Sequence, residues 1–314
     1  MPIKVVQGLP VRKELERERV VTMDEVRART QDIRPLKILI LNLMPKKEAT
    51  ELQLLRLLGN TSLQVEVDLM YTTTHEAANT PVSHLKDFYK TFDQVKNQQY
   101  DGLIITGAPV EHMKYKEVDY INELNTILDW SQTNVFARIY ICWGAQYALY
   151  NYYGIENTKL AEKLFGIYEY RVEQDEHPLL RGFNDTYHVP QSRHTTIDIP
   201  KLEAIEQLEV VTRHPVFGPD IISAKNKRDI FLLGHLEYDR DTLEQEYQRD
   251  LATGQDIEPP VNYYPDDDDT QPADFTWRSY AFLFYNNWLN EVYQHTYYDL
   301  TDLLKEAKDN GKKL

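Results

Sequence analysis

The sequence predicts an α/β fold with a mostly parallel sheet and helices on both of its faces. Apolar runs and segments with helical spacing alternate through the first half of the 314-residue chain. The runs are short and nearly continuous, which is typical of strands buried on both faces. Hydrophobic residues make up 42% of the chain, enough for a sizeable core. Because alternating strands and helices form parallel sheets, we expect ligands to bind beyond the carboxyl ends of the strands.

The first half supplies strands and helices in alternation. Its first strand is an apolar run that lies between Pro35 and Pro45. The helix that follows ends at Gly59, a common C-terminal stop. A later helix comes after Ser83, which is a suitable N-cap. In all, we predict strands at residues 37–43, 63–70, 102–105 and 135–141, and helices at residues 46–58, 85–95, 119–130 and from 144 onwards.

The second half is less regular than the first. Residues 159–171 and 191–199 have the pattern of strands and loops, and residues 221–233 that of a hairpin with a polar turn. A charged helix at residues 242–253 precedes a loop rich in Pro and Asp, which we expect to be solvated. An apolar helix at residues 277–292 should pack on the core.

Charge and cysteine content exclude several classes of protein. The formal net charge of −15 argues against nucleic acid or an anionic membrane as a partner. The single cysteine excludes an intramolecular disulfide and a cysteine-based zinc site, and it fits the reducing cytoplasm. The N-terminus lacks the apolar segment of a secretory signal, and no run approaches the roughly 18 apolar residues that span a bilayer. We therefore expect a cytoplasmic protein that acts on small molecules and holds no metal.

Cys142 is the residue around which the candidate chemistry is arranged. It lies between the apolar run Val135–Ile141 and a small-residue segment that begins at Gly144. A thiol at a strand-to-helix turn meets the N–H groups and the dipole of the helix, which favour the thiolate. A free cysteine without further context is more often an inert core residue. A functional Cys142 therefore needs a base and a group that orients the base.

His235 and Glu237 are the candidates for these two roles. His235 follows an apolar strand, and Glu237 comes two residues later, so that an extended chain projects both to the same side. A glutamate can hold the imidazole in one tautomer and stabilise its protonated form. The other eight histidines show no comparable context. Backbone N–H groups of Trp143 and of Ala108 are the candidates for an oxyanion hole, although the loop of Ala108 has the alternative of an ordinary turn.

Three motifs together resemble the homoserine O-acyltransferases of methionine biosynthesis. They are Cys142-Trp143-Gly144-Ala145-Gln146, Thr106-Gly107-Ala108-Pro109-Val110-Glu111 and Gly234-His235-Leu236-Glu237. The resemblance covers nearly the whole chain, from the N-terminus through residues 41–45 to residues 286–288. That family is similar to the class I glutamine amidotransferases in its flavodoxin-like fold and its Cys-His-Glu triad. Amidotransferases usually carry Gly-x-Cys-x-Gly at this turn, whereas Tyr140 occupies the first position here, which favours the acyltransferase.

The resemblance implies a ping-pong transfer of an acetyl group from acetyl-CoA to the hydroxyl of L-homoserine. Cys142 would take the acyl group, and His235, oriented by Glu237, would remove the hydroxyl proton. Acetyl-CoA is then a co-substrate, with no bound cofactor, and the family suggests a homodimer. Matching positions imply that three further residues bind the substrate: Lys163, Ser192 and Arg249. An arginine suits the substrate carboxylate because its planar fork binds carboxylates in a bidentate manner.

Glu111 is predicted to select the acyl donor. It lies two residues after Pro109, beside the proposed oxyanion loop. A carboxylate there would repel the free carboxylate of succinyl-CoA and leave acetyl-CoA unaffected. Family members that use succinyl-CoA tend to have a small residue at this position. Four alternatives stay open: a Glu111 that points to solvent, a succinyltransferase with the same machinery, a glutamine amidotransferase-like hydrolase, and a non-catalytic flavodoxin-like binding module with an inert Cys142.

These expectations divide the chain into three parts. Residues 1–35 form an N-terminal arm, which packs as a short helix on the body or on a neighbouring subunit. Residues 36–300 form a single α/β catalytic domain that includes the acidic loop 256–273. Residues 301–314 form a C-terminal tail, which is polar and frayed after Lys305.

Overall fold

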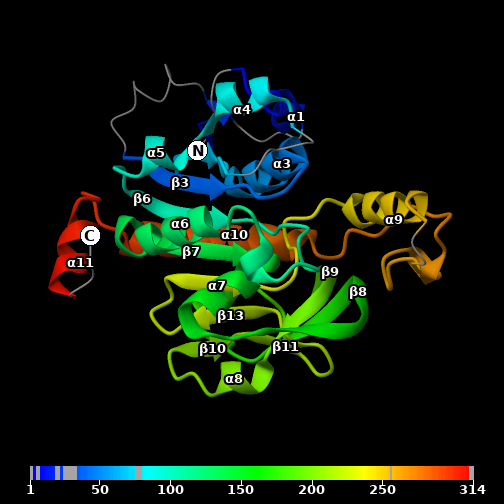
Figure 1. Cartoon of the computed structure of the whole chain (residues 1–314). Helices are drawn as coiled ribbons and strands as arrows, with labels where there is room; N and C mark the ends of the chain where they lie inside the picture. Colours follow the sequence, from blue (N-terminus) through cyan, green and yellow to red (C-terminus); the bar gives the residue numbers. More distant parts are fainter. Residues whose placement is uncertain are drawn as a thin grey trace.

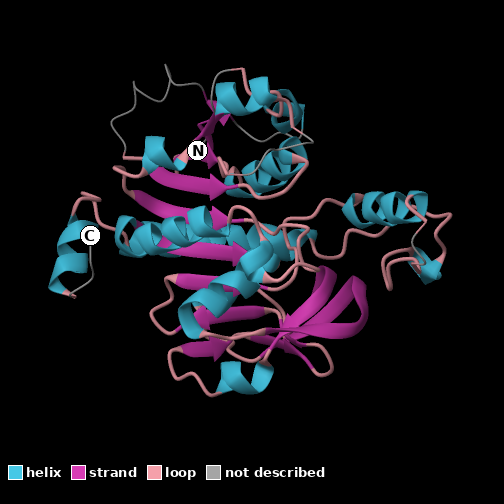
Figure 2. Cartoon of the chain, in the orientation of Figure 1, coloured by secondary structure: helices cyan, strands magenta, loops and turns pink. Residues whose placement is uncertain are grey.

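The computed structural model describes residues 3–4, 8–17, 22–23, 34–74, 80–254 and 257–310. The strands among these residues form two sheets. The larger sheet has the strand order β10-β13-β14-β7-β6-β3-β4-β1-β2, with β5 paired to β4. Its strands from β14 to β2 are parallel, whereas β13 and β10 are antiparallel to their neighbours. Helices cover both faces of this sheet (Figure 1), and Figure 2 shows the same layers by type of element. The predicted α/β fold with a mostly parallel sheet is confirmed.

The larger sheet is built from ten short strands. They are β1 (Ile3–Lys4), β2 (Thr22–Met23), β3 (Leu36–Leu41), β4 (Val65–Met70), β5 (Tyr89–Lys90), β6 (Tyr100–Ile105), β7 (Val135–Ile141), β10 (Leu208–Val210), β13 (Ile221–Ala224) and β14 (Asp229–Leu232). The helices are α1 (Arg12–Arg17), α3 (Lys47–Leu58), α4 (Val82–Phe88), α5 (Phe92–Val95), α6 (Ile121–Asn134), α7 (Trp143–Tyr153), α8 (Ile199–Glu203), α9 (Thr242–Ala252), α10 (Arg278–His295) and α11 (Asp302–Asp309). Short 3₁₀ turns occur at η1 (Tyr115–Glu117), η2 (Pro178–Leu180) and η3 (Pro265–Asp267). None of these helices is long and apolar enough to cross a bilayer.

Strand β3 shows why the sheet is covered on both faces. Ile38 and Ile40 belong to one buried cluster, which includes side chains of α3 and α10. Leu39 and Leu41 belong to the other cluster, with side chains of α6 and α7. Because successive strand residues point to opposite faces, a continuous apolar run is needed wherever both faces are packed.

The second sheet has the strand order β12-β11-β8-β9 and is dominated by one long hairpin. Its strands are β8 (Asn157–Val172), β9 (Thr186–Ile197), β11 (Thr212–His214) and β12 (Gly218–Pro219). β8 extends beyond the expected segment 159–171 at both ends, whereas β9 begins before the expected segment 191–199 and ends at Ile197. The hairpin projects beside the carboxyl ends of the parallel strands (Figure 1). The predicted hairpin at residues 221–233 is confirmed as β13 and β14 of the larger sheet.

The described part of the N-terminal arm packs on the chain's own body. Strand β1 pairs with β4 and with β2, so the arm adds two edge strands to the larger sheet. Helix α1 buries Leu15 completely. Of the arm, residues 1–2, 5–7, 18–21 and 24–33 lie outside the described residues.

The single helix predicted for residues 85–95 is wrong. The chain forms α4, the short strand β5, and then α5. β5 adds to the edge of β4, with Tyr89 opposite Leu69. Thr91 then starts α5 with a capping box that includes Gln94. The helix therefore breaks at Tyr89, because this residue takes an extended conformation that delivers its hydroxyl to a buried glutamate, Glu51.

The expectation that the chain is frayed after Lys305 is also wrong for its described part. Residues 302–309 form α11, which is amphipathic and packs against α6. Leu303 and Ala307 are buried, and Glu306 forms an ion pair with Arg228 at 2.9 Å. The polar composition of the segment hides these two apolar residues, which lie four apart on one helix face. Residues 311–314 lie outside the described part.

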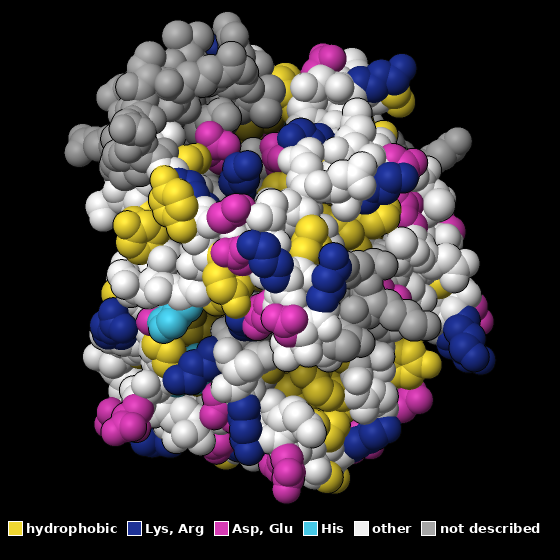
Figure 3. All heavy atoms as spheres, turned by 90° about the vertical axis from the view of Figure 1, so that its left-hand side faces the viewer, with side chains coloured by type: hydrophobic (Ala, Val, Ile, Leu, Met, Phe, Trp, Pro, Cys, Tyr) yellow, Lys and Arg dark blue, Asp and Glu magenta, His cyan; other side chains and the backbone are white. Residues whose placement is uncertain are grey.

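Surface charges of both signs are mixed on the face that carries the amino ends of the strands. Figure 3 shows acidic and basic side chains interspersed there, with small separate apolar areas. This face lies opposite the carboxyl ends of β3, β6 and β7, to which the arrows in Figure 1 point. Cys142 directly follows β7 at those carboxyl ends.

Candidate active site

Cys142 occupies a strained turn between β7 and α7. Its backbone has φ 49° and ψ −114°, a conformation that residues with a side chain rarely adopt. The N–H group of Cys142 donates to the carbonyl oxygen of Leu232 at 2.7 Å, which ties the turn to β14. A Cβ at Gly144 would lie 2.7 Å from the carbonyl oxygen of Thr106, so only glycine allows α7 to begin this close to β6. Such a turn presents a nucleophile at the edge of a parallel sheet.

Tyr140 replaces the first glycine of the amidotransferase pattern without entering the site. Its side chain is fully buried and stacks on Phe231, with ring centroids 5.1 Å apart. Its hydroxyl donates to Oδ1 of Asp229 at 3.2 Å, and Asp229 also pairs with Arg138 at 2.5 Å. Tyr140 is thus a core residue that links β7 to β14, and the turn at Cys142 does not need a glycine there.

His235 and Glu237 lie next to Cys142 in a turn that follows β14. Nδ1 of His235 lies 2.6 Å from Oε1 of Glu237, and the two side chains are only 4% and 7% exposed. A Cβ added at Gly107 would lie 3.3 Å from Cβ of Cys142 and 3.6 Å from Cε1 of His235, so both residues border the same gap. The contact arises in a turn, in which Tyr238 N–H donates to the carbonyl oxygen of His235 at 3.2 Å, and not in an extended chain.

The surroundings of His235 favour its protonated form. Burial opposes the charge, but the carboxylate of Glu237 and the thiol of Cys142 outweigh it and hold the pKa of His235 well above its usual value. The ring of Tyr238 stacks on the imidazole, with centroids 4.1 Å apart. Burial, together with the carboxylates of Glu246 and Glu237, raises the pKa of Tyr238, so its hydroxyl stays protonated. An imidazolium can stabilise a neighbouring thiolate, which is the form in which a cysteine serves as a nucleophile.

The site opens into a pocket of about 320 Å³. It is bordered by the ends of β3, β6 and β7, by the β8–β9 hairpin and by α9. The structure brings seven of the predicted site residues to this pocket: Ala108, Glu111, Cys142, Lys163, Ser192, His235 and Arg249. Glu237 does not line the pocket but contacts Nδ1 of His235. Trp143 is fully buried.

The two candidate oxyanion donors flank Cys142. The N–H group of Trp143 is the first of α7, and the first amides of a helix have no acceptor within that helix. Ala108 follows Gly107, where an added Cβ would lie 3.3 Å from Cβ of Cys142. The two amides therefore belong to the two segments that enclose the thiol, and they remain the candidates for binding a developing negative charge.

Glu111 lines the pocket and is held by the backbone of the opposite hairpin. Its Oε2 accepts a hydrogen bond from the N–H group of His194 at 2.5 Å. Burial raises the pKa of Glu111, and the His194 amide and the charges of His235 and Arg193 counteract part of this effect. The ring of His194 lies against that of His112, with centroids 4.5 Å apart. The carboxylate of Glu111 is thus fixed within the pocket, and the alternative that it points to solvent is not what the structure has.

Lys163 and Arg249 meet at a shared carboxylate, that of Asp250. Nζ of Lys163 lies 3.1 Å from Oδ2 of Asp250, and Nη2 of Arg249 lies 2.7 Å from Oδ1. Burial raises the pKa of Asp250, but hydrogen bonds from Arg249 and Lys163 outweigh it and hold the pKa below its usual value. Lys163 is 14% exposed, whereas Arg249 is 56% exposed. Arg249 therefore has N–H groups free to face an incoming anion from the open side of the pocket.

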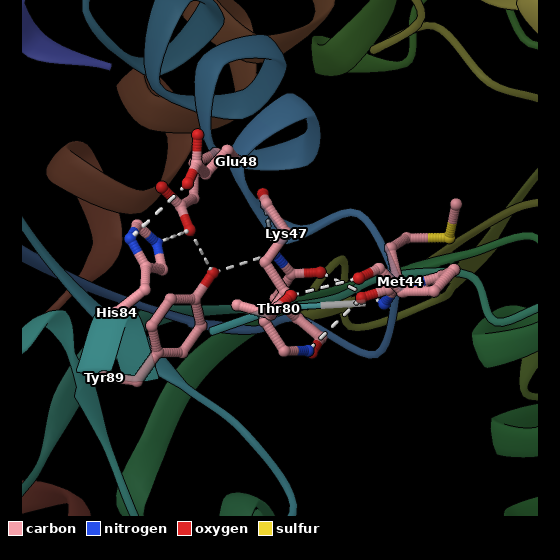
Figure 4. Close-up of polar contacts among 9 residues, drawn as sticks. Met44, Lys47, Glu48, Thr80, His84 and Tyr89 are labelled. Carbon is pink, nitrogen blue, oxygen red and sulfur yellow. Dashed lines mark hydrogen bonds and ion pairs between the residues drawn. The ribbon is translucent and has the colours of Figure 1, made fainter. Parts of the chain in front are cut away.

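A buried lysine holds the strand end that forms another wall of the pocket. Nζ of Lys47 donates to the carbonyl oxygens of Asn42 at 2.6 Å and of Met44 at 3.3 Å, and Met44 and Pro45 line the pocket. The hydroxyl of Thr80 donates to the carbonyl oxygen of Pro45 at 3.1 Å. Figure 4 shows these contacts converging on the segment. Burial lowers the pKa of Lys47 to about 8.

Next to Lys47, a second set of polar side chains shares the carboxylate of Glu51. The Tyr89 hydroxyl donates to Oε1 of Glu51 at 2.6 Å, and Nε2 of His84 lies 2.8 Å from the same oxygen (Figure 4). Nδ2 of Asn42 donates to the Tyr89 hydroxyl at 3.0 Å. The cluster therefore connects α4 and β5 to the turn after β3.

Sequence reasoning missed several residues of the pocket. His112 and His194 were grouped with histidines of no special context, although His112 directly follows Glu111. Tyr238 and Glu246 were not singled out either. Glu246 did carry a signal, because it lies three residues before Arg249 on a predicted helix and so shares its face. His194 and Tyr238 had no such signal, since only the packing of distant segments brings them to the pocket.

The fold places the chain in a structural class of α/β proteins. A solved glutamine amidotransferase from Thermotoga maritima superposes with a TM-score of 0.57, at 14% identity, over 83% of this chain and 99% of that one. A second solved protein, named SMU.1228c, gives a TM-score of 0.54 at 16% identity, over 82% of this chain and 100% of its own. At such identities the likeness shows the fold alone, which is that of the class I glutamine amidotransferases.

Sequence comparison then defines the family. The model of the family described as homoserine O-succinyltransferase matches residues 2–298. The homoserine O-acetyltransferase of Acetivibrio thermocellus is 50% identical over 304 residues, which are 96% of this chain and 100% of that protein. That of Shouchella clausii is 50% identical over 303 residues, 96% of this chain and 98% of its own. The chain belongs to the homoserine O-succinyltransferase family of acyltransferases, as its motifs predict.

Proposed function

We propose that this protein transfers the acetyl group of acetyl-CoA to the hydroxyl of L-homoserine and forms O-acetyl-L-homoserine, a step of methionine biosynthesis. The observation that carries the proposal is the strained Cys142 beside the buried pair of His235 and Glu237, in a pocket that also holds Glu111. The names of relatives at 50% identity support both the acetyl group and the homoserine acceptor.

The reaction has two halves that share one nucleophile. The thiolate of Cys142 attacks the thioester carbonyl of acetyl-CoA, and the N–H groups of Trp143 and Ala108 stabilise the oxyanion. The CoA thiolate leaves and takes the proton of the His235 imidazolium, so that the acetyl group remains as a thioester on Cys142. His235 then accepts the proton of the homoserine hydroxyl as its oxygen attacks this thioester. Collapse of the second tetrahedral intermediate releases the ester and regenerates the thiolate, while Glu237 stabilises each imidazolium.

Glu111 supports acetyl-CoA over succinyl-CoA as the donor. Its carboxylate is fixed by the His194 amide within the pocket. The free carboxylate of a succinyl group would approach a like charge at low solvation, which costs on the order of several kcal/mol at an effective dielectric of 20. An acetyl group carries no charge and avoids this repulsion. Because the family is described by the succinyl reaction, a succinyltransferase with the same machinery is the second candidate.

Intact mass spectrometry tests the first half of the reaction. Mixing the protein with acetyl-CoA alone should add one acetyl group, and adding L-homoserine should remove it as O-acetyl-L-homoserine. The Cys142→Ala variant is the control and should gain no mass. No gain in the wild type, or a gain that persists in the variant, would exclude the acyl-enzyme. Turnover of glutamine without acyl-CoA would instead support an amidotransferase-like hydrolase.

The Glu111→Gly variant tests the choice of donor. Removing the carboxylate should raise kcat/KM for succinyl-CoA and lower the preference for acetyl-CoA, because the repulsive charge is gone. A Glu111→Gln variant separates charge from volume, since it keeps the size of the side chain. If succinyl-CoA use stays equally low in both variants, the pocket argument is wrong and the donor is chosen elsewhere.

The assembly and location are also proposals. We propose a homodimer, as the family resemblance suggests, and light scattering of the purified protein would measure it. We propose a cytoplasmic location because a single thiol nucleophile stays reduced there. Fractionation of cells that express the protein would test this.

A further inference from the structure

Three consecutive backbone N–H groups directly after β14 are held by residues outside that strand. The N–H group of Leu233 donates to the carbonyl oxygen of Asp220 at 2.9 Å, and that of Gly234 donates to Oδ1 of Asp220 at 2.8 Å. The N–H group of His235 donates to the carbonyl oxygen of Pro190 at 2.9 Å. Asp220 thus supplies two of the three acceptors that fix the segment between β14 and the proposed base.

The side chain of Asp220 is a buried carboxylate with donors on both of its oxygens. Only 1% of the residue is exposed. Besides the Gly234 amide, Oδ1 accepts from Nε2 of Gln191 at 3.1 Å, and Oδ2 accepts from the Tyr187 hydroxyl at 2.5 Å. Burial raises the pKa of Asp220, and these three hydrogen bonds counteract part of this effect. The carboxylate cannot turn away from Gly234 without leaving a buried donor unpaired, which costs free energy.

Gly234 allows this carboxylate to reach the backbone. A Cβ at Gly234 would lie 2.6 Å from Oδ1 of Asp220 and 2.5 Å from Nε2 of Gln191. Both of these side chains are buried and hydrogen-bonded to each other, so neither has open space into which it could move. Glycine tolerates such a close approach because it has no Cβ. The glycine that precedes the proposed base therefore has a task in the fold that the reaction itself does not require.

The same network reaches the helix that follows Cys142. Nε of Arg193 donates to Oε1 of Gln191 at 2.9 Å, and Nη1 of Arg193 donates to the carbonyl oxygen of Thr195 at 2.9 Å. The Thr195 hydroxyl donates to Oε1 of Gln146 at 2.8 Å. The N–H group of Gln146, on α7, donates in turn to the carbonyl oxygen of Cys142 at 3.0 Å. One series of buried hydrogen bonds therefore joins the segment before the base to the turn that carries the nucleophile.

We infer that Asp220 is a positioning residue that sets His235 against Cys142 through its hydrogen bond to the Gly234 N–H group. The inference rests on the proposed function only in taking Cys142 as the nucleophile and His235 as its base. The carboxylate of Asp220 bonds to the backbone before the imidazole, whereas the imidazole itself is paired with Glu237. The role of Asp220 is therefore one of geometry and not of charge. Because a misplacement of about 1 Å can cost about a hundredfold in rate, loss of this hold has a measurable effect.

The test measures how fast iodoacetamide alkylates Cys142 at pH 7. Cys142 is the only cysteine of the chain, so the gain in intact mass reports on this thiol alone. Only the thiolate reacts, and the imidazolium of a correctly placed His235 stabilises it. Asp220→Ala removes the acceptor of the Gly234 N–H group and should slow alkylation by about 10- to 100-fold.

The direction of the change separates positioning from general damage to the fold. Cys142 is 3% exposed, so a fold that is merely loosened would expose the thiol and speed its alkylation. An Asp220→Ala variant that is alkylated as fast as the wild type, or faster, overturns the inference. Thermal unfolding of each variant shows that the rates are measured on folded protein.

Asp220→Asn and Tyr187→Phe are the matched comparisons. The asparagine Oδ1 can still accept from Gly234 and Gln191 while its Nδ2 donates to the Tyr187 hydroxyl, so this variant should keep the wild-type rate. Tyr187→Phe removes the hydrogen bond to the other oxygen, Oδ2, and should lower the thermal stability without slowing alkylation. If Asp220→Asn is as slow as Asp220→Ala, the charge and not the geometry matters, and the inference is overturned.

Amide hydrogen exchange decides the case in which Asp220→Ala does not fold. The Gly234 amide should be strongly protected in the wild type and in Asp220→Asn, because the same oxygen accepts from it in both. Protection in both proteins together with a normal alkylation rate in Asp220→Asn supports the inference. Rapid exchange of this amide in the folded wild type refutes it.

Failure of the proposed function gives a different result from failure of this inference. His235→Ala should slow alkylation at least as much as Asp220→Ala. If His235→Ala leaves the rate unchanged, His235 does not stabilise the thiolate, so the proposed triad is wrong and the inference fails with it. If His235→Ala is slow and Asp220→Ala is not, the triad stands and only the inference is overturned.

Discussion

Replacing Glu237 by glutamine removes the charge that stabilises His235 while keeping the size of the side chain. Nδ1 of His235 lies 2.6 Å from Oε1 of Glu237, and both side chains are almost fully buried. The other carboxylate oxygen, Oε2, has no hydrogen-bond partner among the described residues, so little else opposes the substitution. The variant should therefore fold, and its defect should be confined to the protonation of His235.

The size of the effect follows from the charges that are lost. At an effective dielectric of 20, two unit charges about 4 Å apart interact by about 4 kcal/mol. If the transition state carries a full imidazolium, losing this interaction lowers kcat by about a thousandfold. Glu237 contributes to the raised pKa of His235, so the pKa should fall in the variant. The alkaline limb of the kcat/KM profile, which reports loss of that proton in the free enzyme, should move to lower pH.

The assay is the loss of thioester absorbance on turnover of acetyl-CoA and L-homoserine across the pH range, with thermal unfolding of each variant alongside. Glu206→Gln makes the same substitution at an exposed position outside the pocket, and as a control it should leave the pH profile of kcat/KM unchanged. A Glu237→Gln variant that loses activity with an unshifted alkaline limb would refute the reasoning, because its defect would not act through the proton of His235.

Three further predictions concern the fold. Gly144→Ala should lower the free energy of unfolding by about 1–3 kcal/mol and abolish acylation of Cys142, because the new Cβ would lie 2.7 Å from the Thr106 carbonyl oxygen. Unchanged activity would contradict the turn geometry. Burial lowers the pKa of His177 to about 4. Between about pH 6.5 and 4, therefore, the unfolded chain binds this proton and the folded protein does not. The free energy of unfolding should fall by up to about 3 kcal/mol as the pH is lowered through this range. Chemical denaturation should show that His177→Phe removes this pH dependence. Leu303→Ala should cost about 2–3 kcal/mol in the same assay because Leu303 is buried, and an unchanged free energy of unfolding would contradict the packing of α11.

The parallel strands could be predicted because their signal is local. Strand β7 spans the predicted residues, since a fully buried strand must be apolar at every position. Cys142, His235 and Glu237 could be singled out for a related reason: each follows a strand, and strand ends meet at one edge of the sheet. The turn in which His235 contacts Glu237 was not predictable, because the tertiary packing around Tyr238 determines it.

What could not be predicted depends on contacts between distant segments. The helix expected at residues 85–95 breaks because Tyr89 reaches Glu51, which lies 38 residues earlier in the chain. No helical spacing reports such a contact. Likewise His194 enters the pocket because the β8–β9 hairpin places its backbone against Glu111. Glu246 is intermediate, since its helix and its spacing to Arg249 were visible but its hydrogen bonds with Ser192 and Tyr238 were not.

In the proposed function, the groups that perform the chemistry and those that recognise the substrates come from different parts of the fold. Cys142, His235 and the amide of Ala108 all lie close to the carboxyl ends of strands of the parallel sheet, whose hydrogen bonds fix those ends. Ser192, Lys163 and the pocket face of α9 come instead from the second sheet and from a helix beyond the last parallel strand. Substitutions in this second group should therefore change which acceptor is used while the acylation of Cys142 persists. In the proposed function, the strand ends therefore supply the nucleophile and its base, while the second sheet and α9 determine which acceptor reaches them.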